Sequence, residues 1–153
     1  MKAPQTPQTF GFLVKDVSRL SVANFERHAE ELGLTLTQCK VLAHLHRNEG
    51  VSQIRLAELT ETDPMTLVRI LDRMEEQGWI ERRAHETDRR ARKLFLRRAA
   101  VPIVNRIWEF ADRARSEALA GLSAKERDKL MSLLERVHAN LVEIVGSKRK
   151  EAA

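Results

Sequence analysis

The fold is decided by residues 52–98, which read SQIRLAELTETDPMTLVRILDRMEEQGWIERRAHETDRRARKLFLRR. They predict a helix capped by Ser52, a tight turn, a second helix and a two-stranded hairpin. Asp63 is a favoured N-cap, and Pro64 suits the first helical position, where its missing N–H is not needed. Apolar residues then recur at helical spacing and mark the face to be buried: Leu67, Ile70, Leu71 and Met74. Gly78 ends this second helix, and an extended segment follows.

The opposite face of the second helix carries a gradient of charge. Toward its start this stripe carries the neutral Met65 and the basic Arg69, and Thr66 and Arg73 lie beside the stripe. Acidic residues gather toward its end. Neutral or basic first turns suit a helix whose N-terminal end enters the major groove of DNA.

The predicted hairpin concentrates the positive charge of the chain. Strands are expected at 79–84 and 93–97, joined by a loop at 85–92. Residues 82–98 contain eight Lys or Arg and two acids, a local charge of +6, whereas the whole chain carries +5. Phosphate binding favours such a concentration, because neutralising several phosphates releases condensed counterions. A solvated surface loop, the alternative, usually mixes its charges, so the hairpin favours double-stranded DNA as a partner.

A sequence pI near 9.8 also fits an anionic membrane surface. That alternative requires basic residues along one side of an amphipathic helix. Here they lie mostly on a hairpin, which favours DNA over a membrane.

Long helices are predicted on both sides of the central segment. An apolar stripe runs along residues 10–32, and Thr37 is the expected N-cap of the next helix. A further helix follows the hairpin over residues 100–118. Ser123 and Glu126 then form a capping-box pattern that begins the last helix.

The terminal helices carry more apolar surface than the middle of the chain could cover. Burying it against a second copy predicts a homodimer, and a twofold axis would place two reading helices about one helical turn of DNA apart. We therefore expect a mainly α (α+β) protein. Its predicted parts are a flexible arm at 1–9, a helical dimerisation region at 10–33 and 100–146, a DNA-binding lobe at 34–99 and a loose tail at 147–153.

Composition narrows the classes of function. The chain has 153 residues, of which 42% are hydrophobic, which suits one domain or two small, closely joined ones. No apolar run approaches the ~20 residues of a membrane span, and the N-terminal residues lack the apolar stretch of a signal peptide, so we expect a cytoplasmic protein. One cysteine excludes an intramolecular disulfide. No Gly-rich phosphate loop, His-Glu-x-x-His motif or nucleophile elbow occurs, so we expect neither an enzyme nor a cofactor.

Taken in order, these residues resemble the MarR family of transcription regulators, and more closely its SlyA branch. Residues 67–82 resemble the recognition helix running into the first wing strand, and 88–93 resemble the wing signature, an Asp two residues before an Arg. Residues 52–57 and Leu36-Thr37-Gln38-Cys39 are similar to the starts of earlier helices. The resemblance covers about residues 10–146. It implies a winged helix-turn-helix DNA-binding lobe, a pseudo-palindromic operator, and a small aromatic or phenolic ligand between the dimerisation helices and that lobe.

The resemblance also assigns roles to individual residues. Met65, Thr66 and Arg69 match positions that face base edges and phosphates in the major groove. Arg90 matches the wing arginine that enters the minor groove, where the negative potential favours arginine, and Asp88 would hold it in place. Four further residues match positions near phosphates or the DNA backbone: Ser52, Gln53, Arg89 and Arg92. Arg73, beside the outward stripe of the second helix, is a further candidate DNA contact. The SlyA branch more often has Pro at the position of Met65, whereas in this sequence the proline, Pro64, lies one place earlier. This difference affects where the helix starts and therefore which bases it would read.

Other functions on the same scaffold stay open. Cys39 could sense peroxide, but it lies on an apolar helix face and is expected in the core. The resemblance also implies that this position borders a ligand cavity. His44 and His46 are two residues apart and point in different directions, so they cannot share a metal as an i, i+4 pair can. A regulatory zinc whose ligands converge in space and an adaptor that does not bind DNA are the remaining alternatives.

Overall fold

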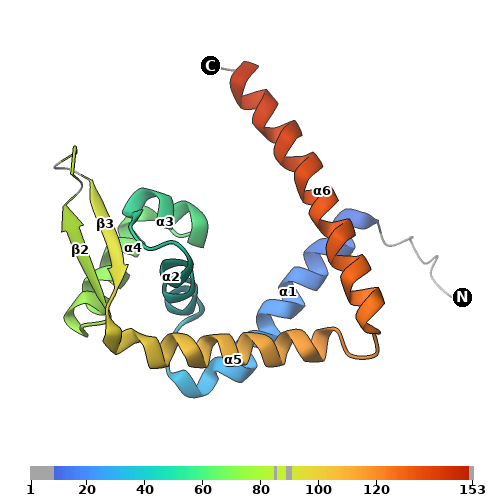
Figure 1. Cartoon of the computed structure of the whole chain (residues 1–153), viewed down its shortest axis with the longest axis horizontal. Coiled ribbons are helices and arrows are strands. Elements are labelled where there is room, and N and C mark those ends of the chain that lie inside the picture. The colour runs from blue at the N-terminus through green and yellow to red at the C-terminus, as the bar shows by residue number, and fades with distance from the viewer. Residues whose placement is uncertain (1–8, 85, 89–90, 152–153) are drawn as a thin grey trace, which may run out of the picture. The chain divides into compact units, whose positions relative to one another are not determined.

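The computed structural model describes residues 9–84, 86–88 and 91–151, with side chains described as far as Gly146 (Figure 1). It divides into two compact units after Arg115. In the described ranges no helix is both long and apolar enough to cross a membrane. The elements are α1 (Phe10–Ala29), η1 (Glu30–Leu32), α2 (Leu36–Arg47), β1 (Val51–Ser52), α3 (Gln53–Thr60), α4 (Pro64–Glu76), β2 (Ile80–Ala84), β3 (Arg92–Leu96), η2 (Arg98–Ala100), α5 (Val101–Ala118) and α6 (Ala124–Glu151).

Helix α2 begins earlier than the sequence predicted. Its N-cap is Thr35, and the expected cap Thr37 lies inside the helix. The Thr35 hydroxyl accepts the Gln38 backbone N–H at 3.2 Å, and the Gln38 side chain accepts the Thr35 backbone N–H at 2.8 Å. A cap at Thr37 would place Lys40 three residues on, and an ammonium cannot accept this hydrogen bond.

The hairpin forms, and a third strand joins it. Strands β2 and β3 lie within one residue of their predicted bounds. The antiparallel sheet has the order β1-β3-β2, with Leu94 opposite both Val51 and Arg82. Strand β1 was not predicted, because two residues are too short for an alternating pattern.

The core joins α2, α3 and α4 to the sheet and to the first half of α5. Leu67, Leu71 and Met74 are fully buried, as the pattern of α4 predicted, and Ile70 is half-buried against the same cluster. The other fully enclosed large side chains include Leu42, Leu45, Leu56, Ile80, Leu94 and Val104. One face of α4 is thereby held in place, and its opposite face points outward.

Gly50 sits where only glycine fits without strain. Its φ of +78° is in the left-handed region, and an added Cβ would lie 3.3 Å from Cζ of Phe95. Its N–H also donates to the Leu94 carbonyl at 2.9 Å, which starts the pairing of β1 with β3.

We therefore expect Gly50→Ala to lower the free energy of unfolding by about 1–2 kcal/mol, measured by chemical denaturation. Gly11→Ala is the matched control, since Gly11 lies in α1 and nothing comes within 4 Å of its added Cβ. That change should be neutral or stabilise by up to about 1 kcal/mol. Equal effects of the two substitutions would contradict this account.

Helix α1 packs on α5 through its C-terminal half. The Asn24 side chain donates to the Ala114 carbonyl at 3.2 Å, and just beyond α1 the η1 residue Glu31 forms an ion pair with Arg106. The N-terminal half is different, because its large apolar side chains are exposed: Phe10, Phe12, Leu13, Val14, Val17 and Leu20.

The second unit consists mainly of α6. The predicted capping box is confirmed: the Glu126 carboxylate accepts the Ser123 N–H at 2.8 Å, and the Ser123 hydroxyl accepts the Glu126 N–H at 3.3 Å. The Ser123 N–H and the Ser123 hydroxyl both donate to this carboxylate and lower the pKa of Glu126. The helix runs to Glu151, past the loose tail that was expected from residue 147, because one glycine inside a helix costs only about 1 kcal/mol.

Candidate nucleic-acid interface

Local hydrogen bonds determine where α3 and α4 start. The Ser52 hydroxyl accepts the Arg55 N–H at 3.2 Å and caps α3. Asp63 caps α4 by accepting the Thr66 N–H at 3.0 Å, and Pro64 is the first helical residue. Both predicted caps are confirmed, and the start of α4 at Pro64 makes Met65 its second residue.

The outward face of α4 presents most of the predicted reading residues. Met65 is 68% exposed, and Thr66, Arg69 and Arg73 are exposed as well. Residues 65, 69 and 73 follow one another at i, i+4 spacing, so they share this face. The Thr66 hydroxyl also approaches the Asp63 carboxylate at 3.3 Å, which holds that side chain against the helix start.

The remaining predicted residues lie at the ends of short elements. Ser52 and Gln53 are half-buried where β1 meets α3, and Arg92 is exposed at the start of β3, opposite Ala84. Asp88 is exposed, and its carbonyl accepts the Ala91 N–H at 3.1 Å. Arg89 and Arg90 fall outside the described residues.

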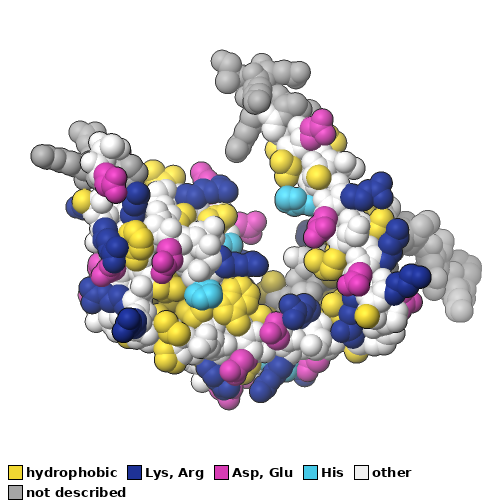
Figure 2. Space-filling model, viewed as in Figure 1, with side chains coloured by type: hydrophobic (Ala, Val, Ile, Leu, Met, Phe, Trp, Pro, Cys, Tyr) yellow, Lys and Arg dark blue, Asp and Glu magenta, His cyan; other side chains and the backbone are white. Residues whose placement is uncertain are grey.

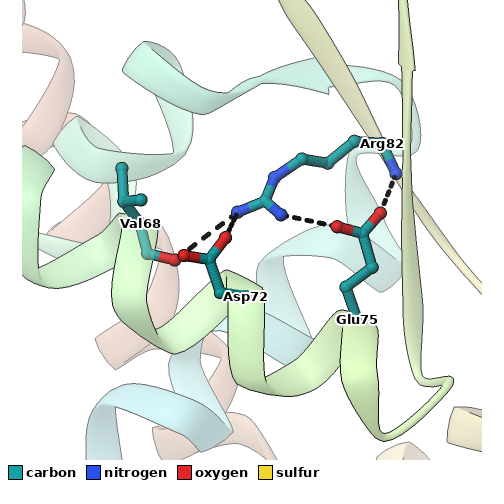
Figure 3. Close-up of polar contacts among 4 residues, drawn as sticks. All are labelled: Val68, Asp72, Glu75 and Arg82. Carbon is teal, nitrogen blue, oxygen red and sulfur yellow. Dashed lines mark hydrogen bonds and ion pairs between the residues drawn. The ribbon is translucent and has the colours of Figure 1, made fainter.

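Arg82 was not predicted to have a special role, yet it joins the sheet to α4 (Figure 3). Its guanidinium lies 2.6 Å from the Asp72 carboxylate and 2.6 Å from that of Glu75. The pairing explains why acids gather toward the end of α4. A signal was present in the sequence, since Asp72 and Glu75 are three residues apart and share one side of the helix.

The basic hairpin is less one-sided than its sequence indicated. Glu81 precedes the counted segment and forms ion pairs with both Arg83 and Arg97. The Arg83 guanidinium also lies over the Phe95 ring, 4.1 Å from its centroid. Figure 2 accordingly shows acidic and basic side chains interleaved over the sheet. Part of the positive charge therefore stabilises the sheet, and the exposed Arg92 remains at the loop end.

An open pocket of about 640 Å³ lies between the end of α1 and the start of α2. Phe25, Leu34 and Cys39 line it, together with charged residues of α1. Cys39 is 2% exposed, and burial raises the pKa of its thiol to about 11. The predicted core position of Cys39 beside a cavity is confirmed. At neutral pH this thiol stays protonated, which does not favour a peroxide sensor, because the thiolate is the reactive form.

The described residues bring together no group of three or more His, Cys, Asp or Glu side chains suited to a metal ion. Trp79 and Trp108 are partly buried and pack against the core. Trp108 also carries the Arg47 guanidinium 5.3 Å from its ring centroid.

The MarR family model matches residues 34–91, from just before α2 to the wing loop. A solved structure, that of the transcriptional regulator PA3341, is 33% identical and covers 88% of this chain and 99% of its own, with a TM-score of 0.77. The chain belongs to the MarR family.

Other members of the MarR family have the same fold. A solved MarR is 26% identical over 96% of this chain and 99% of its own, with a TM-score of 0.78. A mutant MarR from E. coli, complexed with operator DNA, is 25% identical over 83% of this chain and 91% of its own, with a TM-score of 0.69. The protein is thus a MarR-family transcriptional regulator, and the predicted mainly α, winged helix-turn-helix fold is confirmed.

Proposed function

We propose that this regulator binds double-stranded DNA as a homodimer, with α4 in the major groove and the wing loop in the adjacent minor groove of a pseudo-palindromic operator. The observation that carries the proposal is the exposed N-terminal half of α4, whose other face is held in the core. A helix presented in this way fits the major groove, where its first turns meet base edges. The relative complexed with operator DNA supports DNA binding as such.

Each proposed contact has a chemical reason. Met65, Thr66 and Arg69 read base edges, since methyl groups meet thymine and arginine meets guanine. Arg90 enters the minor groove and is held by Asp88. The positions assigned to phosphates are Ser52, Gln53, Arg73, Arg89 and Arg92. Ser52 suits this role because its hydroxyl accepts an N–H while keeping its own hydrogen to donate.

The proposed dimer rests on exposed apolar side chains. Helix α6 exposes Leu130, Met131, Leu133, Leu134, Leu141, Val142, Ile144 and Val145, and α1 exposes a stripe of its own. Figure 2 shows hydrophobic side chains along α6. Contiguous apolar surface of this extent is typical of a protein interface. Twofold symmetry would bury the stripes and duplicate the reading helix.

The proposed dimer also assigns each part of the chain to a function. We assign residues 10–33 and 100–146 to dimerisation and 34–99 to DNA binding, with 1–9 as an arm and the end of α6 outside both. Membership of the SlyA branch is part of the same proposal and rests on the stretches at 67–82 and 88–93.

A small aromatic or phenolic ligand is proposed to modulate DNA binding from the pocket between α1 and α2. Phe25, Leu34 and Cys39 suit an aromatic ring, and Arg27 and Glu30 at the same pocket can bind its polar group. A ligand that prefers one arrangement of the two reading helices would shift the population away from the DNA-compatible form.

The test is a binding titration on a duplex that the wild-type protein selects from a randomised pool. Arg69→Ala should weaken binding by about 1–3 kcal/mol and relax specificity at the base it reads. Arg90→Ala should weaken binding by at least about 1 kcal/mol and lower the dependence of log K on log[salt] by about one.

Arg115→Ala is the control for these variants. It removes the same charge from α5, where Arg115 is paired with Asp112, and should leave the salt dependence unchanged. An unchanged salt slope for Arg90→Ala would count against the minor-groove assignment. Failure of the wild type to bind either heparin or random duplex at moderate salt would favour a protein-binding adaptor instead.

A further inference from the structure

Arg82 makes every hydrogen bond described for it with α4. From strand β2 its Nη1 donates to the Glu75 carboxylate at 2.6 Å, and its Nη2 donates to the Asp72 carboxylate at 2.6 Å (Figure 3). Nη2 also lies 3.4 Å from the Val68 carbonyl. The backbone N–H of Arg82 donates to the same Glu75 carboxylate at 3.1 Å. Both the backbone and the side chain of one wing residue are therefore fixed to the reading helix.

The same geometry makes Arg82 a poor phosphate ligand. Its side chain is only 17% exposed, and two carboxylates neutralise it, so the three groups together carry a charge of −1. Phosphate binding would require giving up charge-assisted hydrogen bonds, which are the strong ones. Partly buried ion pairs are also screened less by salt than exposed ones.

We infer that Arg82 is a positioning residue, which holds the wing at a fixed distance and angle from α4 so that both enter their grooves together. This inference rests on the proposed function. Two binding elements joined rigidly in the bound geometry lose less freedom on binding, and the second contact forms at a high effective concentration. Without the link, each element would still meet phosphates, but the two would fit the selected site less well as a pair.

The inference predicts that Asp72→Ala changes the affinity for two kinds of DNA differently. Asp72→Ala deletes a negative charge and leaves Arg82 closer to a phosphate ligand, so binding to a random duplex should stay equal or tighten. Binding to the selected duplex should weaken, because Arg82 is then held to α4 only through Glu75 and the Val68 carbonyl, so the wing is fixed less firmly. The ratio of the two affinities therefore falls although the protein has become more positive. Alanine also favours the helix more than aspartate, which protects α4 itself.

The experiment measures binding of a selected duplex and a random duplex over a salt series, for the wild type, Arg82→Met, Asp72→Ala and the double variant. Each single change should lower the ratio of affinities about tenfold, and the double variant should fall no further, since both break one link. Arg82→Lys should restore part of the ratio, because a point charge reaches one carboxylate but not the whole fork of acceptors. Circular dichroism and thermal melting establish that each variant is folded at the assay temperature.

Glu81→Ala is the matched control, because it removes the same charge from β2, where Glu81 pairs only with Arg83 and Arg97 among the described contacts. Its ratio of affinities should equal that of the wild type. Arg82 would instead be a phosphate ligand if Arg82→Met lowered the salt slope by about one on both duplexes and Asp72→Ala tightened both. A lower melting temperature with an unchanged ratio would also overturn the inference. Failure of the wild type to bind either duplex would overturn the proposed function itself.

Discussion

Leu134→Glu combined with Leu141→Glu should convert the protein to a single chain of 17.6 kDa and weaken binding to the selected duplex by at least about 100-fold. The two leucines are 41% and 52% exposed and lie seven residues apart on α6, so they share one stripe. In the proposed dimer each new carboxylate would be buried without a partner, which costs several kcal/mol per group. A single chain contacts only one half-site of the operator, so it loses the affinity that a dimer gains by binding both half-sites at once. Analytical ultracentrifugation and the duplex titration measure the two effects.

The matched control places the same charges on the opposite side of the helix. Ser132 and Ala139 are exposed, are also seven residues apart, and face away from the leucine stripe by helical periodicity. Ser132→Glu with Ala139→Glu should keep the mass and the DNA affinity of the wild type. A wild-type protein that sediments as one chain, or leucine variants that keep the wild-type mass, would refute the α6 interface.

Ile80→Ala should lower the free energy of unfolding by about 2–5 kcal/mol. Ile80 begins β2, is fully buried, and belongs to the core that joins the sheet to α4. Its truncation leaves a cavity beneath the wing and removes a β-branched side chain from a strand. Urea denaturation of the protein without DNA, followed by circular dichroism, measures the loss.

Ile54→Ala is the control for Ile80→Ala, because it makes the same substitution at an exposed position. Ile54 lies in α3 and is 77% exposed, so its removal should change stability by no more than about 0.5 kcal/mol. The comparison separates the cost of the cavity from any general effect of the isoleucine-to-alanine change. Similar losses at both positions would mean that the core does not lie where we describe it.

The caps, the turns and the buried face of α4 were predictable because each depends on a few neighbouring residues. Asp63 and Ser52 each cap a helix through the backbone N–H group three residues on, so the short motif is the whole interaction. The spacing of Leu67, Leu71 and Met74 likewise reports one face of a helix wherever that helix packs. Thr37 was the wrong cap for an equally local reason, since two threonines competed and only Thr35 has a glutamine at the required distance.

The sequence predicted that the wing is positively charged, but not which groups its basic side chains bind. The eight basic residues of 82–98 are visible in the sequence, whereas Arg82 has its acidic partners on α4 and Arg97 pairs with Glu81 of β2. Whether Arg82 binds Asp72 and Glu75 or a phosphate depends on where β2 crosses α4, which no short motif encodes. The proposed DNA contacts of Arg69 and Arg90 remain predictions for the same reason.

The chain alone therefore determined the order of helices, the two faces of α4 and the basic wing, since these follow from contacts between near neighbours. The tertiary structure decided the pairing of β1 with β3, the burial of Cys39 beside a pocket and the attachment of Arg82 to α4. Each of these joins residues far apart in sequence or unites separate elements, and their chemistry becomes specific only once the backbone brings them within a few ångströms.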